Sequence, residues 1–336
     1  MTDTHSAATS RQDATGPRPT PGRDGLPGPD IGPDAPTRLD RRAWWTAARD
    51  AFMAVPRDKL TDRAAALTYY GVLSIFPGLL VLVSVLGLLD DQAADAVVRE
   101  ATAVAPAEVK SLIDDSLTEL RASQTAGLMA VVGVLGALWA ASGFVGAFIR
   151  ASNQSYRTPE GRPFWKTAFL QVVVTVVVGT MAVVATGMLI VSGPVAEWVG
   201  RLLGVGGGAV TFWNIAKWPV LLGLVSVIVA TLYRASPNAR QGGFHWVSPG
   251  GVMAVVVWVL MSAGFSMYVA NFGSYNRTYG AVASVIVFLV WLWLSNIALL
   301  VGVELDARLE RARIAAAGYH PSREPFLQMR DDSAVT

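Results

Sequence analysis

The sequence has no cysteine, which excludes disulfide bonds, thiolate metal sites and cysteine nucleophiles together. Histidine is nearly as scarce, and His5, His245 and His320 are too far apart along the chain to form the clustered motif of a zinc hydrolase. The chain also lacks a phosphate-binding loop that ends in Gly-Lys-Ser/Thr and a Gly-x-Ser-x-Gly nucleophile elbow. We therefore expect no enzyme activity, no cofactor and no metal site.

Charge is scarce as well, with 15% charged against 52% hydrophobic residues, whereas about a quarter of the residues of a soluble domain are charged. A helix of about 20 apolar residues crosses a bilayer core of about 30 Å. Six stretches are long enough: about 65–89, 126–149, 168–193, 214–233, 247–270 and 279–303. The sequence thus predicts an all-α polytopic membrane protein, a bundle of six transmembrane helices.

The regions outside these stretches complete the predicted domain organisation. Residues 1–40 contain seven of the 18 prolines and no apolar run, so we expect a disordered tail, followed by a membrane domain over 41–313 and a flexible tail over 314–336. Apolar residues at helical spacing predict an N-terminal interfacial helix: Trp44, Ala47, Ala48, Ala51, Phe52 and Val55. Pro106 divides the first outer loop into two amphipathic halves, which predicts a small outer helical hairpin. The segment ELDARLERARIA, 304–315, is typical of an amphipathic helix with a solvated face.

The distribution of basic residues sets the expected orientation. Fifteen Lys and Arg residues flank the spans on the side that holds both termini, against six on the other side. This asymmetry predicts a bacterial inner-membrane protein with both termini in the cytoplasm. The net charge of +2 is too small to indicate nucleic-acid binding, so membrane lipids, and a lipid or amphipathic solute, are the expected partners. The sequence does not fix an oligomeric state.

Polar side chains in and beside the spans are the candidate site. In the first span Pro77 predicts a kink, and its neighbouring polar groups either face a cavity or bond to other helices. Three charges, Arg63, Arg150 and Glu304, share one depth at the cytoplasmic edge, where they either pair with one another or reach water singly. The other candidates for a cleft at this end are Tyr69, Tyr70, Ser74, Asn153, Ser295 and Asn296.

The short connection NFGSYNRTYG, 271–280, is dense in amides and phenols. Asn and Gly tolerate turn dihedral angles, and Tyr suits the membrane interface, so a tight turn explains the composition. The alternative is an outer gate or a head-group site, formed by Asn271, Tyr275, Asn276 and Tyr279.

Three blocks of the sequence resemble the YihY/BrkB family of bacterial inner-membrane proteins: AAALTYYGVLSIFPGLLVL, LWAASGFVGAFIRASNQSY and the long block from YVANFGSYNRTYG to ELDARLER. The resemblance covers about residues 45–313. It implies a six-helix inner-membrane protein; members were once labelled ribonuclease BN, a label generally held to be mistaken, and some have been linked to serum resistance or envelope-lipid export. No residue-level mechanism comes with it.

Together these observations favour a protein that transports or flips an amphipathic envelope component, such as a lipid, through a polar cleft. The alternative is a non-transporting membrane scaffold or binding protein in envelope maintenance. A membrane ribonuclease is the third and weakest hypothesis.

Overall fold

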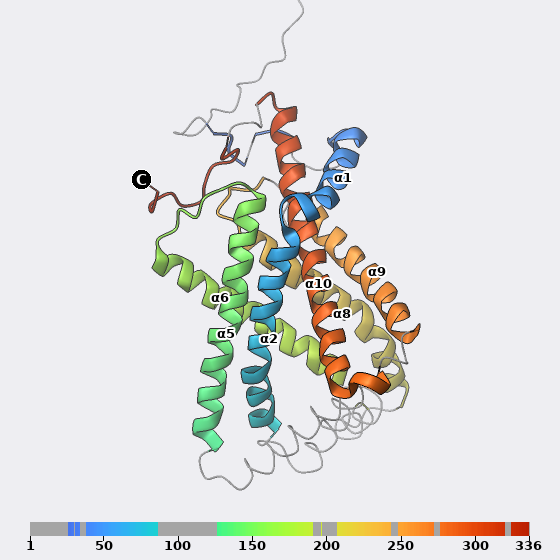
Figure 1. The fold of residues 1–336 in the computed structure, drawn as a ribbon. Coiled ribbons are helices and arrows are strands. Elements are labelled where there is room, and N and C mark those ends of the chain that lie inside the picture. The colour runs from blue at the N-terminus through green and yellow to red at the C-terminus, as the bar shows by residue number, and fades with distance from the viewer. Residues whose placement is uncertain are drawn as a thin grey trace, which may run out of the picture.

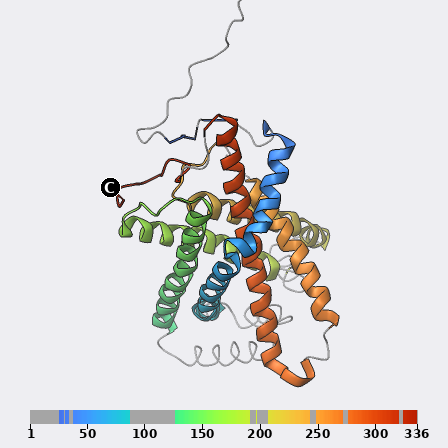
Figure 2. The same cartoon turned by 45° about the horizontal axis from the view of Figure 1, so that its top comes forward.

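The protein is a bundle of long helices, seen as a computed structural model in Figures 1 and 2. The structure describes residues 26–29, 31–33, 38–86, 126–190, 196, 207–242, 248–271, 276–319 and 324–335. The helices of this part are α1 (Arg41–Arg57), α2 (Leu60–Leu86), α5 (Ala126–Ser155), α6 (Phe164–Ile190), α8 (Gly207–Ala235), α9 (Pro249–Asn271) and α10 (Asn276–Ala316). The described residues contain no strand beyond one isolated bridge between Ala239 and Met329, which confirms the all-helical fold.

Five of the described helices, α5, α6, α8, α9 and α10, are long and apolar enough to cross a membrane. The first predicted span, 65–89, falls on α2, whose helix is described as far as Leu86. The count of six therefore stays a prediction. The outer hairpin also stays one, because 90–125 lies outside the described residues.

Several observed helices extend beyond the predicted spans. α8 begins at Gly207 rather than near 214, so Gly207 and Gly208, outside the predicted span, belong to its first turn. α10 begins at Asn276 and continues to Ala316. A hydropathy window finds the part of a helix that lies in lipid, and the helix continues beyond it because its backbone remains hydrogen-bonded.

The arrangement places α10, the longest helix, against most of the other elements (Figure 1). α2 packs against α5 and α10, α9 packs against α10, and α6 packs against α5 and α8. α9 and α10 approach closely at two glycines: a Cβ on Gly302 would lie 2.4 Å from the Gly250 carbonyl oxygen and 2.3 Å from the Tyr233 hydroxyl. Small residues permit such backbone contacts in a membrane.

The N-terminal helix α1 packs across α10. Its Ala47 and Ala51 are buried together with Leu305 and Leu309 of α10. Most of the face that predicted an interfacial helix is therefore used for a helix–helix contact, although Phe52 remains 46% exposed. The solvated face predicted for 304–315 is wrong in part, because Glu304, Glu310 and Arg313 on this segment are buried.

The two tails also differ from expectation in their described segments. Leu26 and Ile31 are buried, as are Phe326 and Leu327, and Gln328 Nε2 donates to the Leu26 carbonyl at 3.1 Å. Each tail is too poor in apolar residues to form a core alone, but each covers the other and the end of α10. We call this end of the bundle, at the top of Figure 1, the tail end.

The outward faces of α6 and α9 are apolar. Phe169 and Val183 on α6, and Leu260 and Met267 on α9, are each more than half exposed. Exposed apolar surface of this extent suits contact with lipid. These faces support a multi-pass membrane protein.

Candidate functional site

A polar pocket of about 670 Å³ opens at the tail end of the bundle. Four segments that are distant in sequence form it: the α1–α2 connection with the first turn of α2, the last turns of α5 with the loop that follows, α10, and the C-terminal segment. Its lining residues are Asp58, Arg63, Arg150, Asn153, Gln154, Ser155, Arg157, Thr158, Pro159, Glu160, Glu304 and Glu324.

The end of α5 shapes one wall of this tail-end pocket. Arg157 takes a left-handed conformation with φ 49°, and the Thr158 amide donates to the Asn153 carbonyl at 2.9 Å while the Arg157 amide donates to the Gln154 carbonyl at 3.1 Å. This is the pattern of a Schellman motif. A non-glycine residue in this conformation costs about 1 kcal/mol, and here it turns the chain so that Arg157 and Glu160 border the pocket.

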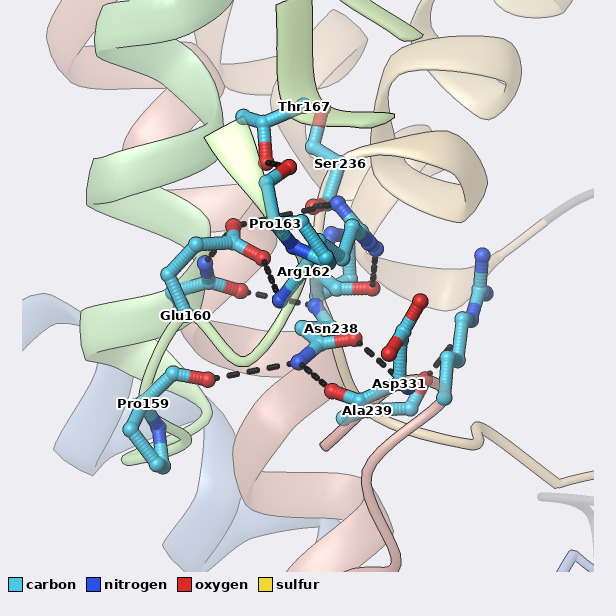
Figure 3. A network of polar contacts seen from close by, with 12 residues as sticks. Pro159, Glu160, Arg162, Pro163, Thr167, Ser236, Asn238, Ala239 and Asp331 are labelled. Atoms are coloured by element: carbon cyan, nitrogen blue, oxygen red, sulfur yellow. Dashed lines mark hydrogen bonds and ion pairs between the residues drawn. The ribbon is translucent and has the colours of Figure 1, made fainter. Parts of the chain in front are cut away.

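A buried network behind the pocket fixes that loop (Figure 3). Asn238 is fully buried. Its side chain donates to the Pro159 carbonyl at 3.4 Å and the Asp331 carbonyl at 2.8 Å, and accepts from the Asp331 amide at 3.1 Å. Its backbone amide donates to Asn153 Oδ1 at 2.7 Å, and Asn153 in turn donates to Glu160 at 2.8 Å. Asn153 thus joins the pocket wall to this loop network.

Two cations tie the loop network to the helices around it. The Arg162 guanidinium donates to the Ser236 and Pro237 carbonyls at 3.3 and 3.0 Å (Figure 3), and burial lowers its pKa although Glu160 and Asp331 act in the opposite sense. Lys166, in the first turn of α6, donates to Asp331 at 2.6 Å. This bond, with further bonds from Ser333, holds the pKa of the Asp331 carboxyl well below its usual range.

The charges that line the tail-end pocket are unequally paired. Each of its carboxylates is engaged: Glu304 and Asp58 with Arg308 at 2.7 and 3.4 Å, Glu324 with Arg157 at 2.5 Å, and Glu160 with Asn153. Arg63 and Arg150, in contrast, form no ion pair within 4.0 Å with the part of the chain that the structure describes. Among the pocket-lining groups they are the cations open to an added anion.

Four sequence-predicted residues come together in this pocket: Arg63, Arg150, Asn153 and Glu304. Of the two alternatives for the charged ones, direct pairing within 4.0 Å is not formed in the described structure: Glu304 pairs with Arg308, one turn further along α10, and acts on Arg63 from a longer distance. Arg308 also faces Asp50 at 3.7 Å. It is the centre of an acidic cluster that sequence reasoning missed, although the i, i+4 spacing of Glu304 and Arg308 is the usual signal for such a pair.

Other predicted residues serve helix packing. Asn296 donates to Thr68 at 3.1 Å in the buried core, and Ser295 accepts from the Trp258 indole at 3.1 Å. Ser74 donates to the Gly71 carbonyl of its own helix. Tyr70 lies against Gly143, where an added Cβ would be 2.8 Å from its ring.

The remaining candidates do not join the tail-end pocket either. Tyr69 is 61% exposed on the outside of α2. The side chains of Pro77, Asn271, Tyr275, Asn276 and Tyr279 lie outside the described residues, so the kink and the outer gate stay predictions.

Buried polar groups near the pocket include residues that no sequence pattern singled out. Glu310 and Arg313 form an ion pair at 2.6 Å, both almost fully buried. Glu310 also accepts from the Gly242 amide at 2.8 Å, and Arg313 donates to the Pro29 carbonyl at 3.1 Å. A second hollow of about 430 Å³ lies beside them, lined in part by Tyr156, Tyr233 and Asp306.

No three His, Asp or Glu side chains gather as a metal-ligand set within the described ranges. The site is therefore one of guanidinium groups, carboxylates, amides and hydroxyls. Such groups bind and orient polar ligands through charge-assisted hydrogen bonds.

Comparison with known proteins agrees with this architecture. The family model of the virulence factor BrkB matches residues 51–326. A protein of Bacillus subtilis named as ribonuclease-like, YfkH, is 30% identical over 257 residues, which cover 75% of this chain and 90% of the relative. A UPF0761 membrane protein of Tolumonas auensis is 27% identical over 75% of this chain and 81% of the relative, and one of Alkalilimnicola ehrlichii is 28% identical over 78% and 58%. No solved structure matches.

Proposed function

The chain belongs to the family of the virulence factor BrkB, and from that premise we propose that it transports or flips an amphipathic envelope component, such as a lipid. The polar part of this molecule enters the tail-end pocket. Its apolar part remains in the bilayer beside α2 and α5. The chain acts without enzyme chemistry of its own.

The observation that carries this proposal is a polar pocket bordered by helices with lipid-facing surfaces. α2 and α5 supply Arg63 and Arg150 to the pocket, and further along the same helices Tyr69 and Trp139 are exposed on the outside of the bundle. An amphipathic molecule placed here keeps its head hydrated or hydrogen-bonded while its chains stay in an apolar environment. Neither part is left in an unfavourable solvent.

The orientation of the proposal follows from the charge asymmetry. The tail end carries the basic connections that predict the cytoplasmic side of a bacterial inner membrane. With that orientation the amphipathic component is loaded from the cytoplasmic leaflet. Reporter fusions after residues 120, 205 and 275 are expected to report the periplasm, and two cytoplasmic signals among them would reverse the topology.

The alternative function is a non-transporting scaffold or binding protein in envelope maintenance. It is favoured by the deeper polar groups, because Asn296 bonds to Thr68 and Ser295 to Trp258. These hydrogen bonds hold helices together below the pocket, so a transport path requires them to exchange partners. A scaffold does not require that exchange.

A vesicle assay separates the two functions. The full chain is reconstituted into vesicles that contain a fluorescent phospholipid, with and without an imposed pH gradient, and transfer between leaflets is measured by chemical quenching from outside. We expect transfer with the wild type, slower transfer when Arg63→Gln and Arg150→Gln are combined, and wild-type transfer with Arg49→Gln, an exposed α1 residue away from the pocket. If the vesicles show no transfer with or without the pH gradient, the transport function is rejected and the scaffold function remains.

A further inference from the structure

We propose that the tail-end pocket recognises a phosphate-bearing anionic headgroup through Arg63 and Arg150. The inference rests on the proposed function in one respect: it takes the pocket as the place where the polar part of an amphipathic molecule binds. It adds the chemical class of that polar part and the residues that select it.

The first step is the state of the two guanidinium groups. Arg63 is partly buried near the start of α2, Arg150 is exposed near the end of α5, and α2 and α5 pack side by side. Neither makes an ion pair within 4.0 Å in the described structure. A guanidinium carries five donors and no acceptor, so both are available to an incoming acceptor.

The second step is the state of the acids. Glu304 is 5% exposed and its Oε1 is bonded to Arg308, and Arg308 also pairs with Asp58. Glu324 is held by Arg157 on the other wall. Three of the four pocket carboxylates thus bond directly to Arg157 or Arg308, and Glu304 and Asp58 attract Arg63 only from beyond ion-pair distance. The guanidinium donors of Arg63 and Arg150 are therefore not engaged by a direct contact with these acids.

The third step is an independent polar group. Ser155 lines the same pocket and is 8% exposed. Its hydroxyl makes no hydrogen bond with any described residue. Leaving a buried hydroxyl without a partner costs about 1–3 kcal/mol. The Oγ has less than 1 Å² of accessible surface, so a ligand oxygen bonds to it, and removes that cost, once the Ser155 side chain rotates toward the pocket.

The donors favour phosphate over carboxylate. A carboxylate has two oxygens and matches a single guanidinium fork. A phosphate group presents several acceptor oxygens in a tetrahedral arrangement, so it can bind two arginines from different helices and a hydroxyl together. The pocket of about 670 Å³ is large enough to hold more than the phosphate itself, as a lipid headgroup requires.

The test is equilibrium binding to the purified full chain in neutral detergent micelles. The probes are dioleoyl phosphatidic acid, dioleoylglycerol with the same acyl chains and no phosphate, oleate as the carboxylate, and inorganic phosphate. We expect phosphatidic acid to bind at least about tenfold more tightly than dioleoylglycerol or oleate, the ratio produced by one charge-assisted contact. Inorganic phosphate should compete with phosphatidic acid for the pocket. If inorganic phosphate binds as tightly as the lipid, the pocket still recognises phosphate, but its ligand is a free phosphate rather than a lipid headgroup.

The variants locate the binding. Arg63→Gln and Arg150→Gln should each weaken phosphatidic acid binding about tenfold, whereas Arg49→Gln removes the same charge from the same end and should leave it unchanged. Ser155→Ala should weaken binding a few-fold without lowering the melting temperature of the lipid-free protein. As a control for folding, melting curves of all variants are measured in the absence of lipid. The Arg63 and Arg150 variants should melt close to the wild type, because neither arginine forms an ion pair in the described structure.

The proposal is overturned if both arginine variants bind phosphatidic acid like the wild type, or if dioleoylglycerol or oleate binds equally well. This outcome is distinct from failure of the proposed function. If phosphatidic acid binds selectively but is not transferred in the vesicle assay, the transport proposal is wrong and the proposed ligand class stands. If lipid is transferred but binding shows no preference for phosphate, the proposed ligand class is wrong and the transport proposal stands.

Discussion

α10 and α6 are both long apolar helices, but they are held in place by different surroundings. α10 buries Glu304, Glu310 and Arg313 among protein groups, and its Gly302 lies against Gly250 and Tyr233. α6 has no charged residue after Lys166, and Gly179 and Gly187 have no heavy atom within 4 Å of an added Cβ. α10 is therefore specified by contacts with other parts of the chain, whereas most of α6 only has to remain apolar.

The largest expected effect comes from breaking the buried ion pair of α10. Glu310→Ala leaves Arg313 buried without its carboxylate and the Gly242 amide without its acceptor. Removing one partner of a buried pair costs about 3–5 kcal/mol of unfolding free energy. Denaturant titration of the protein in detergent would measure this loss, and Glu310→Gln, which keeps an acceptor oxygen, should lose less. A cost of Glu310→Ala below about 1 kcal/mol would mean that the pair acts like an exposed one.

A matched pair of glycine substitutions gives the next effect. Gly302→Ala places a methyl group against the Gly250 carbonyl and the Tyr233 hydroxyl, and overpacking of this kind costs about 1–3 kcal/mol. Gly187→Ala on α6 meets open space and should leave stability unchanged or raise it by up to about 1 kcal/mol, because alanine favours a helix interior over glycine. The same unfolding assay compares them directly. Equal effects would show that α6 has a protein partner on that face.

The smallest effect tests where α6 is attached to the tail end. Because the pKa of Asp331 is lowered chiefly by Lys166, the charged carboxyl contributes stability above its unfolded pKa of about 4. That contribution is lost as the pH falls further toward the folded pKa. Lys166→Met should therefore melt slightly below the wild type near neutral pH, and the gap should narrow below about pH 4. A constant gap across the acid range would assign the effect to packing of the Lys166 side chain.

Local patterns predicted the parts of the fold that lipid determines. Hydropathy placed α9 at 247–270, against Pro249–Asn271 in the structure, because an apolar run of that length has few alternatives to a membrane span. The same reasoning brought Arg63, Arg150 and Glu304 to one depth, and the structure places them around one pocket. Depth can be read from a sequence because it depends on the distance along a helix.

Contacts between distant loops could not be predicted in the same way. Asn238 looks like an ordinary turn residue, and its burial depends on Pro159 and Asp331, 79 and 93 residues away. Arg308 pairs with Glu304 one turn away on the same helix, a spacing that the sequence does show, whereas its contacts with Asp50 and Asp58 depend on how α10 packs against the α1 region. The sequence carries no direct signal for the burial of Asn238 or for these two contacts of Arg308.

The packing of the two tails bears on how the protein is made. Gln328 bonds to the Leu26 carbonyl across 302 residues of sequence. At roughly 5–20 residues per second of synthesis, Leu26 waits roughly 15–60 s for its partner. During that interval the carbonyls of Pro29 and Ile31 also lack Arg313, which donates to both of them in the finished structure. The tail end is therefore the last part of the protein to close, and its closure marks a chain whose helices have all been synthesised.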